Sequence, residues 1–166
     1  MRLRALLQNV CPGCTDGPWM DTEITDVCAD SRRVRPGSLF VAVPGAGAHG
    51  GEYIGQALEA GAAAVLVDEV FAAKIFPLPD RVIPAADIQG NFAGILKRFY
   101  HDPARALKVI GITGTNGKTT VTYLLEAMLA AAGKSCGVIG TVNYRFGAET
   151  LPAKNTTPGI ADIYRY

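Results

Sequence analysis

The sequence has almost no net charge, and this shortage narrows the classes of protein to which it can belong. Its 166 residues include 16 Lys and Arg against 15 Asp and Glu, which gives a net charge of +1. Domains that bind nucleic acid usually carry a clear excess of basic residues. We therefore expect no nucleic-acid partner.

Long apolar runs are also missing. No stretch approaches the roughly 18–20 consecutive apolar residues that a membrane-spanning helix needs. The N-terminal segment MRLRALLQNVCPGC contains two arginines, but its apolar run is too short for the core of a signal peptide. These features predict a cytoplasmic protein with no membrane partner.

Cysteines are few and poorly arranged for metal or redox chemistry. Cys11 and Cys14 have the spacing of half a zinc site, but a structural zinc ion normally has four ligands and no second pair follows. A thioredoxin-like pair would stand at a strand-to-helix turn, whereas this pair lies among Gly, Pro and Asp residues. We expect reduced thiols here.

What the sequence does contain is 49% hydrophobic residues and 19 glycines, a globular composition. Residues 24–98 are predicted to form a compact α/β unit, in which Pro36-Gly37 makes a turn. A helix is expected around residues 52–60 and another over 91–102, where apolar residues recur at helical spacing. Continuous apolar runs predict buried parallel strands, which lie at residues 39–43, 62–69 and 81–87.

A second unit is expected to begin with a strand over residues 108–113. The following helix places apolar residues on one stripe, namely Val121, Leu124, Leu125, Met128, Leu129 and Ala132. Another strand is predicted within residues 135–142. Together these elements predict one βαβ crossover, with its loop at the carboxyl end of the first strand.

That loop has the chemistry that binding of a nucleoside triphosphate requires. Its glycines let the backbone fold around phosphates, and the start of the helix adds a positive end to the same point. Lys118 can reach the β- and γ-phosphates, and Thr119 offers a hydroxyl to Mg²⁺. The match to G-x-x-x-x-G-K-[ST] is imperfect, because Ile112 stands at the first glycine position. A plain glycine-rich turn and an unrelated P-loop NTPase remain alternatives.

The stretch GITGTNGKTT (residues 111–120) resembles the ATP loop of the Mur ligases, a loop that they share with folylpolyglutamate synthases. Two further stretches, DSRRVRPGSLFVAVPG (30–45) and KNTTPG (154–159), are similar to segments of the MurE branch of that family. The resemblance implies an α/β fold with a small N-terminal UDP-sugar-binding domain (1–100). The start of a P-loop ATP-binding domain (101–166) would follow it.

The resemblance also implies roles for individual residues. Ser31, Asn155, Thr156 and Thr157 would bind the UDP-MurNAc-peptide. Lys118 would be the catalytic residue on the phosphates, and Thr119 a ligand of Mg²⁺. The ATP-binding residues would be Gly114, Thr115, Asn116, Gly117, Lys118, Thr119 and Thr120. From the residues themselves, we expect His49 to be an ordinary surface histidine. We expect Arg32, Arg33 and Arg35 to be a solvated cluster, with a phosphate clamp as the alternative.

The activity that the resemblance implies is ATP-dependent amide-bond formation in peptidoglycan precursor synthesis. Diaminopimelate or lysine would be added to UDP-MurNAc-L-Ala-D-Glu through an acyl phosphate, and the full-length enzyme would be a monomer. The family's metal-binding acid and C-terminal domain do not appear in the sequence, so we expect an N-terminal portion that does not turn over substrate. A MurF-like ligase and a non-catalytic UDP-sugar-binding module are the alternatives.

Overall fold

The computed structural model describes residues 1–8, 17–45, 47–153 and 155–166. Cys11 and Cys14 lie outside these residues. The chain forms two compact units, Met1–Pro103 and Ala104–Tyr166. Within the described part, no helix is long and apolar enough to cross a membrane.

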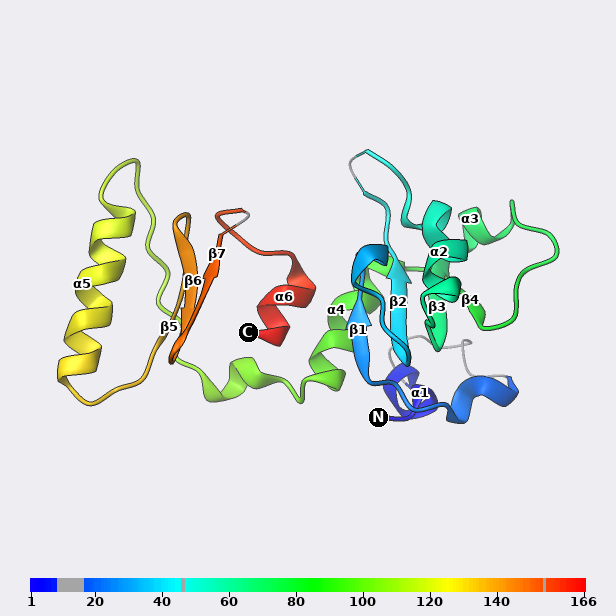
Figure 1. The fold of residues 1–166 in the computed structure, drawn as a ribbon, viewed down its shortest axis with the longest axis horizontal. Coiled ribbons are helices and arrows are strands. Elements are labelled where there is room, and N and C mark those ends of the chain that lie inside the picture. Colours follow the sequence, from blue (N-terminus) through cyan, green and yellow to red (C-terminus); the bar gives the residue numbers. More distant parts are fainter. Residues whose placement is uncertain (9–16, 46, 154) are drawn as a thin grey trace. The chain divides into compact units, whose positions relative to one another are not determined.

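The first unit is built on a parallel four-stranded sheet whose strands follow one another in chain order (Figure 1). The strands are β1 (Asp26–Cys28), β2 (Ser38–Ala42), β3 (Ala64–Asp68) and β4 (Val82–Ala85). In the register of the sheet, Phe40 lies beside Val65 and Val67 beside Pro84. The predicted α/β class with a parallel sheet is therefore confirmed. β1 escaped prediction because its three residues are too few to give an apolar pattern.

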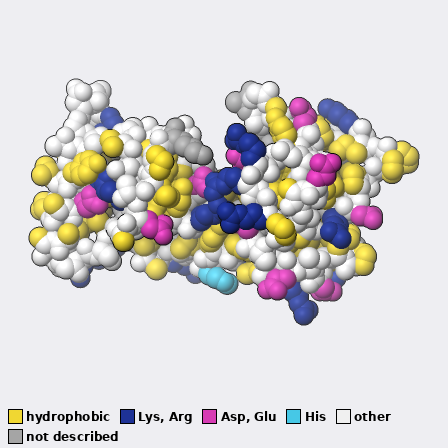
Figure 2. Space-filling view, viewed as in Figure 1, with side chains coloured by type: hydrophobic (Ala, Val, Ile, Leu, Met, Phe, Trp, Pro, Cys, Tyr) yellow, Lys and Arg dark blue, Asp and Glu magenta, His cyan; other side chains and the backbone are white. Residues whose placement is uncertain are grey.

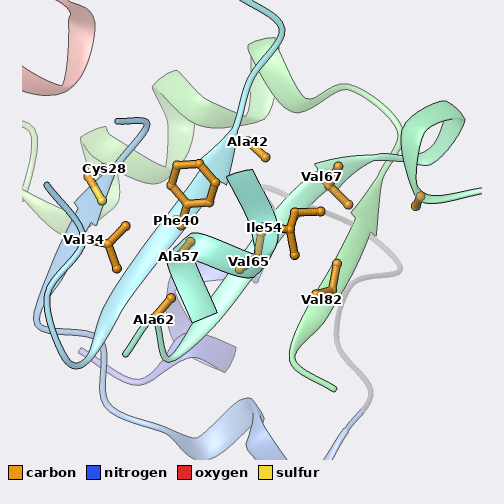
Figure 3. Packing of buried hydrophobic residues seen from close by; sticks show 11 residues of the cluster. Cys28, Val34, Phe40, Ala42, Ile54, Ala57, Ala62, Val65, Val67 and Val82 are labelled. Atoms are coloured by element: carbon orange, nitrogen blue, oxygen red, sulfur yellow. The ribbon is translucent and has the colours of Figure 1, made fainter. Parts of the chain in front are cut away.

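One face of this sheet is covered by α2 (Ile54–Glu59), which follows the 3₁₀ turn η3 (Gly50–Tyr53). Phe40 and Val65 lie buried in the same cluster as Ile54 of that helix (Figure 3). Because the cluster takes alternate residues of β2 and β3, the residues between them point to the opposite face.

The opposite face is covered by α4 (Ile88–Phe99), which contacts β2 and β3, and α4 in turn contacts α1 (Leu3–Leu7). Leu39 and Leu66 are completely buried on this side. A strand that is buried on both faces reads as a continuous apolar run, as these sequences do. The unit also contains four short elements, η1 (Pro18–Asp21), η2 (Ser31–Arg33), α3 (Glu69–Ala72) and η4 (Pro103–Ala106), the last of which runs into the second unit.

The second unit combines one longer helix with a three-stranded antiparallel sheet in the order β5-β6-β7. Its elements are α5 (Lys118–Ala131), β5 (Gly137–Ile139), β6 (Asn143–Phe146), β7 (Glu149–Pro152) and α6 (Ile160–Arg165). The expected helix after the glycine-rich loop is confirmed, and it begins at Lys118.

The predicted βαβ crossover is wrong. Residues 107–114 carry neither helix nor strand, and β5 pairs antiparallel with β6 instead of lying parallel to residues 108–113. Val109 is 82% exposed, although its apolar side chain suggested a buried strand. A strand exists only through hydrogen bonds to a neighbouring strand, and an apolar run cannot reveal whether that neighbour is present.

The apolar stripe of α5 is likewise uncovered. None of the residues of this helix is buried, and Leu124 and Met128 are both more than half exposed. Figure 2 shows hydrophobic side chains spread over the surface of this helix. A stripe of this kind normally faces a protein core. In the second unit the apolar stripe of α5 is exposed, whereas the first unit buries most of the large apolar residues of its helices.

Candidate nucleotide and substrate loops

The glycine-rich loop turns sharply into α5 at two positions that require glycine. Gly114 has a φ of 146° and Gly117, the residue before the helix, has a φ of 77°. Side chains with a Cβ rarely adopt such angles. The loop therefore depends on these two glycines for its path.

The start of α5 offers unpaired backbone donors. The N–H groups of Lys118, Thr119 and Thr120 donate to no acceptor among the described residues, whereas the N–H of Val121 donates to the Gly117 carbonyl at 2.9 Å. Free donors and the positive end of the helix dipole together favour an anion at this point. The geometry fits a phosphate group.

Lys118 folds back over its own loop. Its Nζ donates to the carbonyl oxygen of Gly114 and lies 3.4 Å from that of Thr115. The ammonium group is thus held beside the start of the helix, where a phosphate would meet it. A phosphate that binds here would have to replace these carbonyl oxygens as the partner of the Lys118 ammonium group.

The other predicted residues of the loop face solvent. Thr115, Asn116, Thr119 and Thr120 are all exposed. Among the residues that the structure describes, no group of three or more His, Cys, Asp and Glu could hold a metal ion. The Thr119 hydroxyl could therefore supply only one of several oxygen ligands to Mg²⁺, with phosphates and water supplying the others.

The second predicted substrate loop follows β7. Asn155, Thr156 and Thr157 are exposed, while Pro158 is buried beside them. The hydroxyl of Tyr144 on β6 donates to the Asn155 carbonyl and lies 3.3 Å from the Asn155 N–H. In Figure 1 this loop and the loop before α5 both lie at the upper end of the second unit.

Ser31, the predicted contact to the UDP-sugar, lies in the first unit on η2. Its hydroxyl donates to Oε1 of Gln56 on α2 at 2.8 Å. Beside it, Arg32 makes two hydrogen bonds to the Asp30 carboxylate, at 2.9 and 2.8 Å. Arg32 holds the pKa of Asp30 below its ordinary value. Since the guanidinium is already paired and its side chain is 81% exposed, the structure favours the solvated interpretation for Arg32.

His49 is not the ordinary surface histidine that the sequence suggested. Its Nδ1 accepts a hydrogen bond from the Gly51 N–H at 2.9 Å, and its ring stacks on Phe71 with centroids 4.4 Å apart. Its Nε2 lies 2.7 Å from Oδ2 of Asp68, and its side chain is only 23% exposed. His49 thus joins the turn after β2 to the end of β3.

Gly51 in this network has no room for a larger side chain. A Cβ on Gly51 would come within 2.4 Å of the Phe71 ring, and Asp68 also accepts a hydrogen bond from the Phe71 N–H at 2.8 Å. No local sequence signal pointed to this network, because its members are up to 22 residues apart.

A second network links α5 to the sheet of the same unit. Arg145 on β6 pairs with the Glu126 carboxylate, with Nε 3.0 Å from Oε1 and Nη2 2.5 Å from Oε2. Its guanidinium carbon lies 4.2 Å from the centre of the Tyr123 ring. The hydrogen bonds from Arg145 hold the pKa of Glu126 below its ordinary value. Sequence reasoning missed this pair because 19 residues separate its members.

Comparisons with known proteins point to the same family for both units of the chain. The profile of the Mur ligase family, catalytic domain, matches residues 23–100, and that of the Mur ligase middle domain matches residues 112–165. The chain is 45% identical over 139 residues to a UDP-N-acetylmuramoyl-L-alanyl-D-glutamate–2,6-diaminopimelate ligase of Pseudomonas putida, covering 83% of this chain and 28% of the relative.

A ligase of the same name from Geobacter metallireducens is 39% identical over 171 aligned positions, covering 99% of this chain and 32% of the relative. A solved structure of a protein with this name shares the fold, with a TM-score of 0.69 at 22% identity, covering 99% of this chain and 32% of that one. The chain thus spans about a third of the length of the curated relatives that it matches.

Proposed function

The chain belongs to the Mur ligase family, and on that premise we propose that it binds ATP and UDP-N-acetylmuramoyl-L-alanyl-D-glutamate as part of an ATP-dependent ligase that adds 2,6-diaminopimelate. The observation that carries the proposal is the loop before α5. There, Gly114 and Gly117 shape the backbone, and the first N–H groups of the helix are open beside Lys118.

The names of the relatives support the choice of substrate. Proteins that are 39–45% identical to this chain are named for 2,6-diaminopimelate as the added amino acid. We therefore favour diaminopimelate over lysine. Asn155, Thr156 and Thr157 in the second unit and Ser31 in the first are the proposed contacts to the UDP-MurNAc-peptide.

The proposed chemistry runs in two displacements. A carboxylate oxygen of the UDP-MurNAc-peptide attacks the γ-phosphorus of ATP, the bond to the β–γ bridging oxygen breaks, and ADP leaves. The amine of diaminopimelate then attacks the acyl carbon, loses a proton and displaces phosphate. Lys118 and the N-terminal end of α5 stabilise the charge on the phosphoryl oxygens during the first step.

Mg²⁺ would enter this site together with the nucleotide. Thr119 is the protein ligand that we propose for it, and Mg²⁺ is commonly bound through phosphate oxygens with only one or two protein ligands. When bound, the ion would neutralise charge on the transferred phosphoryl group. We propose no catalytic turnover by this chain alone, because it spans about a third of its relatives.

Titration calorimetry with the magnesium complex of a non-hydrolysable ATP analogue tests the nucleotide part. Lys118→Met should weaken binding about 10- to 100-fold, the range expected for loss of a hydrogen bond to a charged group. Lys134→Met is the matched control, because Lys134 is an exposed lysine just beyond the other end of α5. Equal affinity of the two variants would overturn the role of Lys118.

Titration with UDP-N-acetylmuramoyl-L-alanyl-D-glutamate tests the other part. Binding of the UDP-sugar without binding of the nucleotide would favour a non-catalytic binding module. Nucleotide binding without UDP-sugar binding would overturn the proposed UDP-MurNAc-peptide contacts. A coupled ADP-release assay with both substrates and diaminopimelate should give no turnover, and measurable turnover would contradict the expected inactivity.

A further inference from the structure

The strand β6 lies between the two loops that the proposed reaction uses. It is the central strand of its sheet, paired with β5 on one side and β7 on the other. Tyr144 lies opposite Ile139 and Leu151, and Arg145 lies opposite Val138 and Thr150. Because it is hydrogen-bonded on both sides, β6 cannot slide along the sheet without breaking both ladders.

Adjacent residues of β6 point in opposite directions, as in any strand. Tyr144 is directed to the loop after β7, where its hydroxyl contacts both the carbonyl and the N–H of Asn155. Its side chain is 4% exposed and its ring lies 5.7 Å from that of Tyr166. The hydroxyl is therefore held in place by a packed ring.

Arg145 is directed to α5. It pairs with both oxygens of the Glu126 carboxylate and lies over the Tyr123 ring. It also donates to the side chain of Asn143 on its own strand. Tyr123 and Glu126 lie five and eight residues after Lys118, on the helix that begins at the glycine-rich loop. The guanidinium is thus fixed by partners from both elements.

We infer that β6 sets the position of the glycine-rich loop relative to the Asn155–Thr157 loop, with Arg145 and Tyr144 as its positioning residues. This inference rests on the proposed function, because it assumes that one loop holds the nucleotide and the other the UDP-MurNAc-peptide. Phosphoryl transfer requires the carboxylate oxygen and the γ-phosphorus to meet in line. A misplacement of about 1 Å can reduce the rate of such a step by about 100-fold.

The inference predicts that the two ligands bind with positive coupling. The affinity for the magnesium complex of the non-hydrolysable ATP analogue should rise at least about fivefold when UDP-N-acetylmuramoyl-L-alanyl-D-glutamate is saturating, the lower end of typical coupling. Tyr144→Phe removes one hydroxyl and keeps the ring. It should abolish this coupling and weaken UDP-sugar binding several-fold, while nucleotide affinity without the UDP-sugar stays unchanged.

Tyr53→Phe is the matched control, because the Tyr53 hydroxyl has no hydrogen bond among the described residues and Tyr53 lies in the first unit. Glu126→Gln approaches the same link from α5, and it should reduce coupling without unfolding the sheet. Hydrogen exchange of the Asn155 amide gives a second readout, which should be faster in Tyr144→Phe than in Tyr53→Phe. If Tyr144 had a purely structural role, Tyr144→Phe would lower the thermal stability but leave the coupling between the two ligands unchanged.

The outcomes separate the inference from the function. If the wild-type chain binds neither ligand, the proposed function fails and the inference fails with it. If it binds both without coupling, or if coupling survives in Tyr144→Phe and in Glu126→Gln, the function stands and the positioning role of β6 is overturned. Loss of coupling in both variants, with coupling retained in Tyr53→Phe, supports the inference.

Discussion

The two units of this chain contain similar proportions of apolar residues, but the first unit buries most of its large apolar side chains and the second leaves most of them exposed. In the first unit, helices cover both faces of the parallel sheet, and most of its large apolar side chains are buried. In the second, Val138 and Tyr144 are the buried hydrophobic residues within the described part. An apolar pattern therefore specifies which face of an element can be buried, but burial itself depends on the elements available to cover it.

The difference has a thermodynamic consequence. Burying apolar surface is the main favourable term in folding, at roughly 25 cal/mol for each Å² removed from water. The first unit obtains this term from its own residues. The second unit gains less from apolar burial, so hydrogen bonds and ligands should contribute a larger share of its stability.

The strongest test of this contrast replaces the same residue type in the two units. Leu66→Ala removes a completely buried side chain from the first unit and should reduce its unfolding free energy by about 2–5 kcal/mol. Leu124→Ala removes a side chain that is 59% exposed on α5 and should change stability by no more than about 0.5 kcal/mol. Urea titration followed by hydrogen-exchange mass spectrometry measures the unfolding free energy of each unit separately.

Fluorescence gives an independent measurement for the first unit. Trp19 is the only tryptophan in the sequence and belongs to η1 of that unit. The urea concentration at which its emission changes should be lower in Leu66→Ala than in the unchanged chain. It should stay the same in Leu124→Ala. Comparable losses in the two variants would mean that α5 is covered in solution.

A smaller effect is expected from His49, which shows how the first unit adds polar links to its covered core. His49→Ala removes the acceptor for the Gly51 N–H and should cost about 0.5–2 kcal/mol, the range for loss of an N-terminal helix cap. His49→Asn keeps a side-chain acceptor and should recover part of that loss. Equal losses in urea titrations of the two variants would locate the effect in the ring contacts with Phe71 instead.

The smallest effect concerns the charged pair of the second unit. Arg145 lowers the pKa of Glu126 below its ordinary value of 4.5, so the stabilisation is complete above that value and is lost as pH falls through the lower folded-state pKa. Because the pair is partly exposed, we expect about 1 kcal/mol or less. The protection factors of the α5 amides, which correct for the intrinsic pH dependence of exchange, should fall by about fivefold or less as pH drops below 4.5.

Glu126→Gln should remove this acid sensitivity of α5. Asp30→Asn in the first unit is the control, because Asp30 is also held below its ordinary pKa by an arginine but contacts only its immediate neighbours. It should leave exchange in α5 unchanged. An acid response of α5 that persists in Glu126→Gln would contradict the assignment.

Much of the first unit was predictable because its apolar runs reflect burial in the same unit. The runs at residues 39–43, 62–69 and 81–87 became β2, β3 and β4. α4 began three residues before the expected position, since the Asp87 carboxylate caps it by accepting from the Gly90 N–H at 2.9 Å. Apolar periodicity does not register a cap that precedes the pattern.

The second unit was predictable only where local chemistry decides the structure. The helix start at Lys118 followed from the glycine-rich loop before it. The strand at residues 108–113 and the parallel crossover failed, because both required a partner strand that sequence spacing cannot supply. The links through Tyr144, Arg145 and His49 were also missed, since each joins residues more than ten positions apart.

The alternating directions of Tyr144 and Arg145 also determine which genetic changes β6 can accept. Substitutions at Asn143 or Phe146 alter one side chain, but inserting or deleting a single codon ahead of Tyr144 would turn every later side chain of the strand to the other face. The tyrosine would then face α5 and the arginine would face the Asn155 loop, so both links would fail together. Libraries built on this chain should therefore tolerate length changes at the Gly147 turn far better than within the four residues before it.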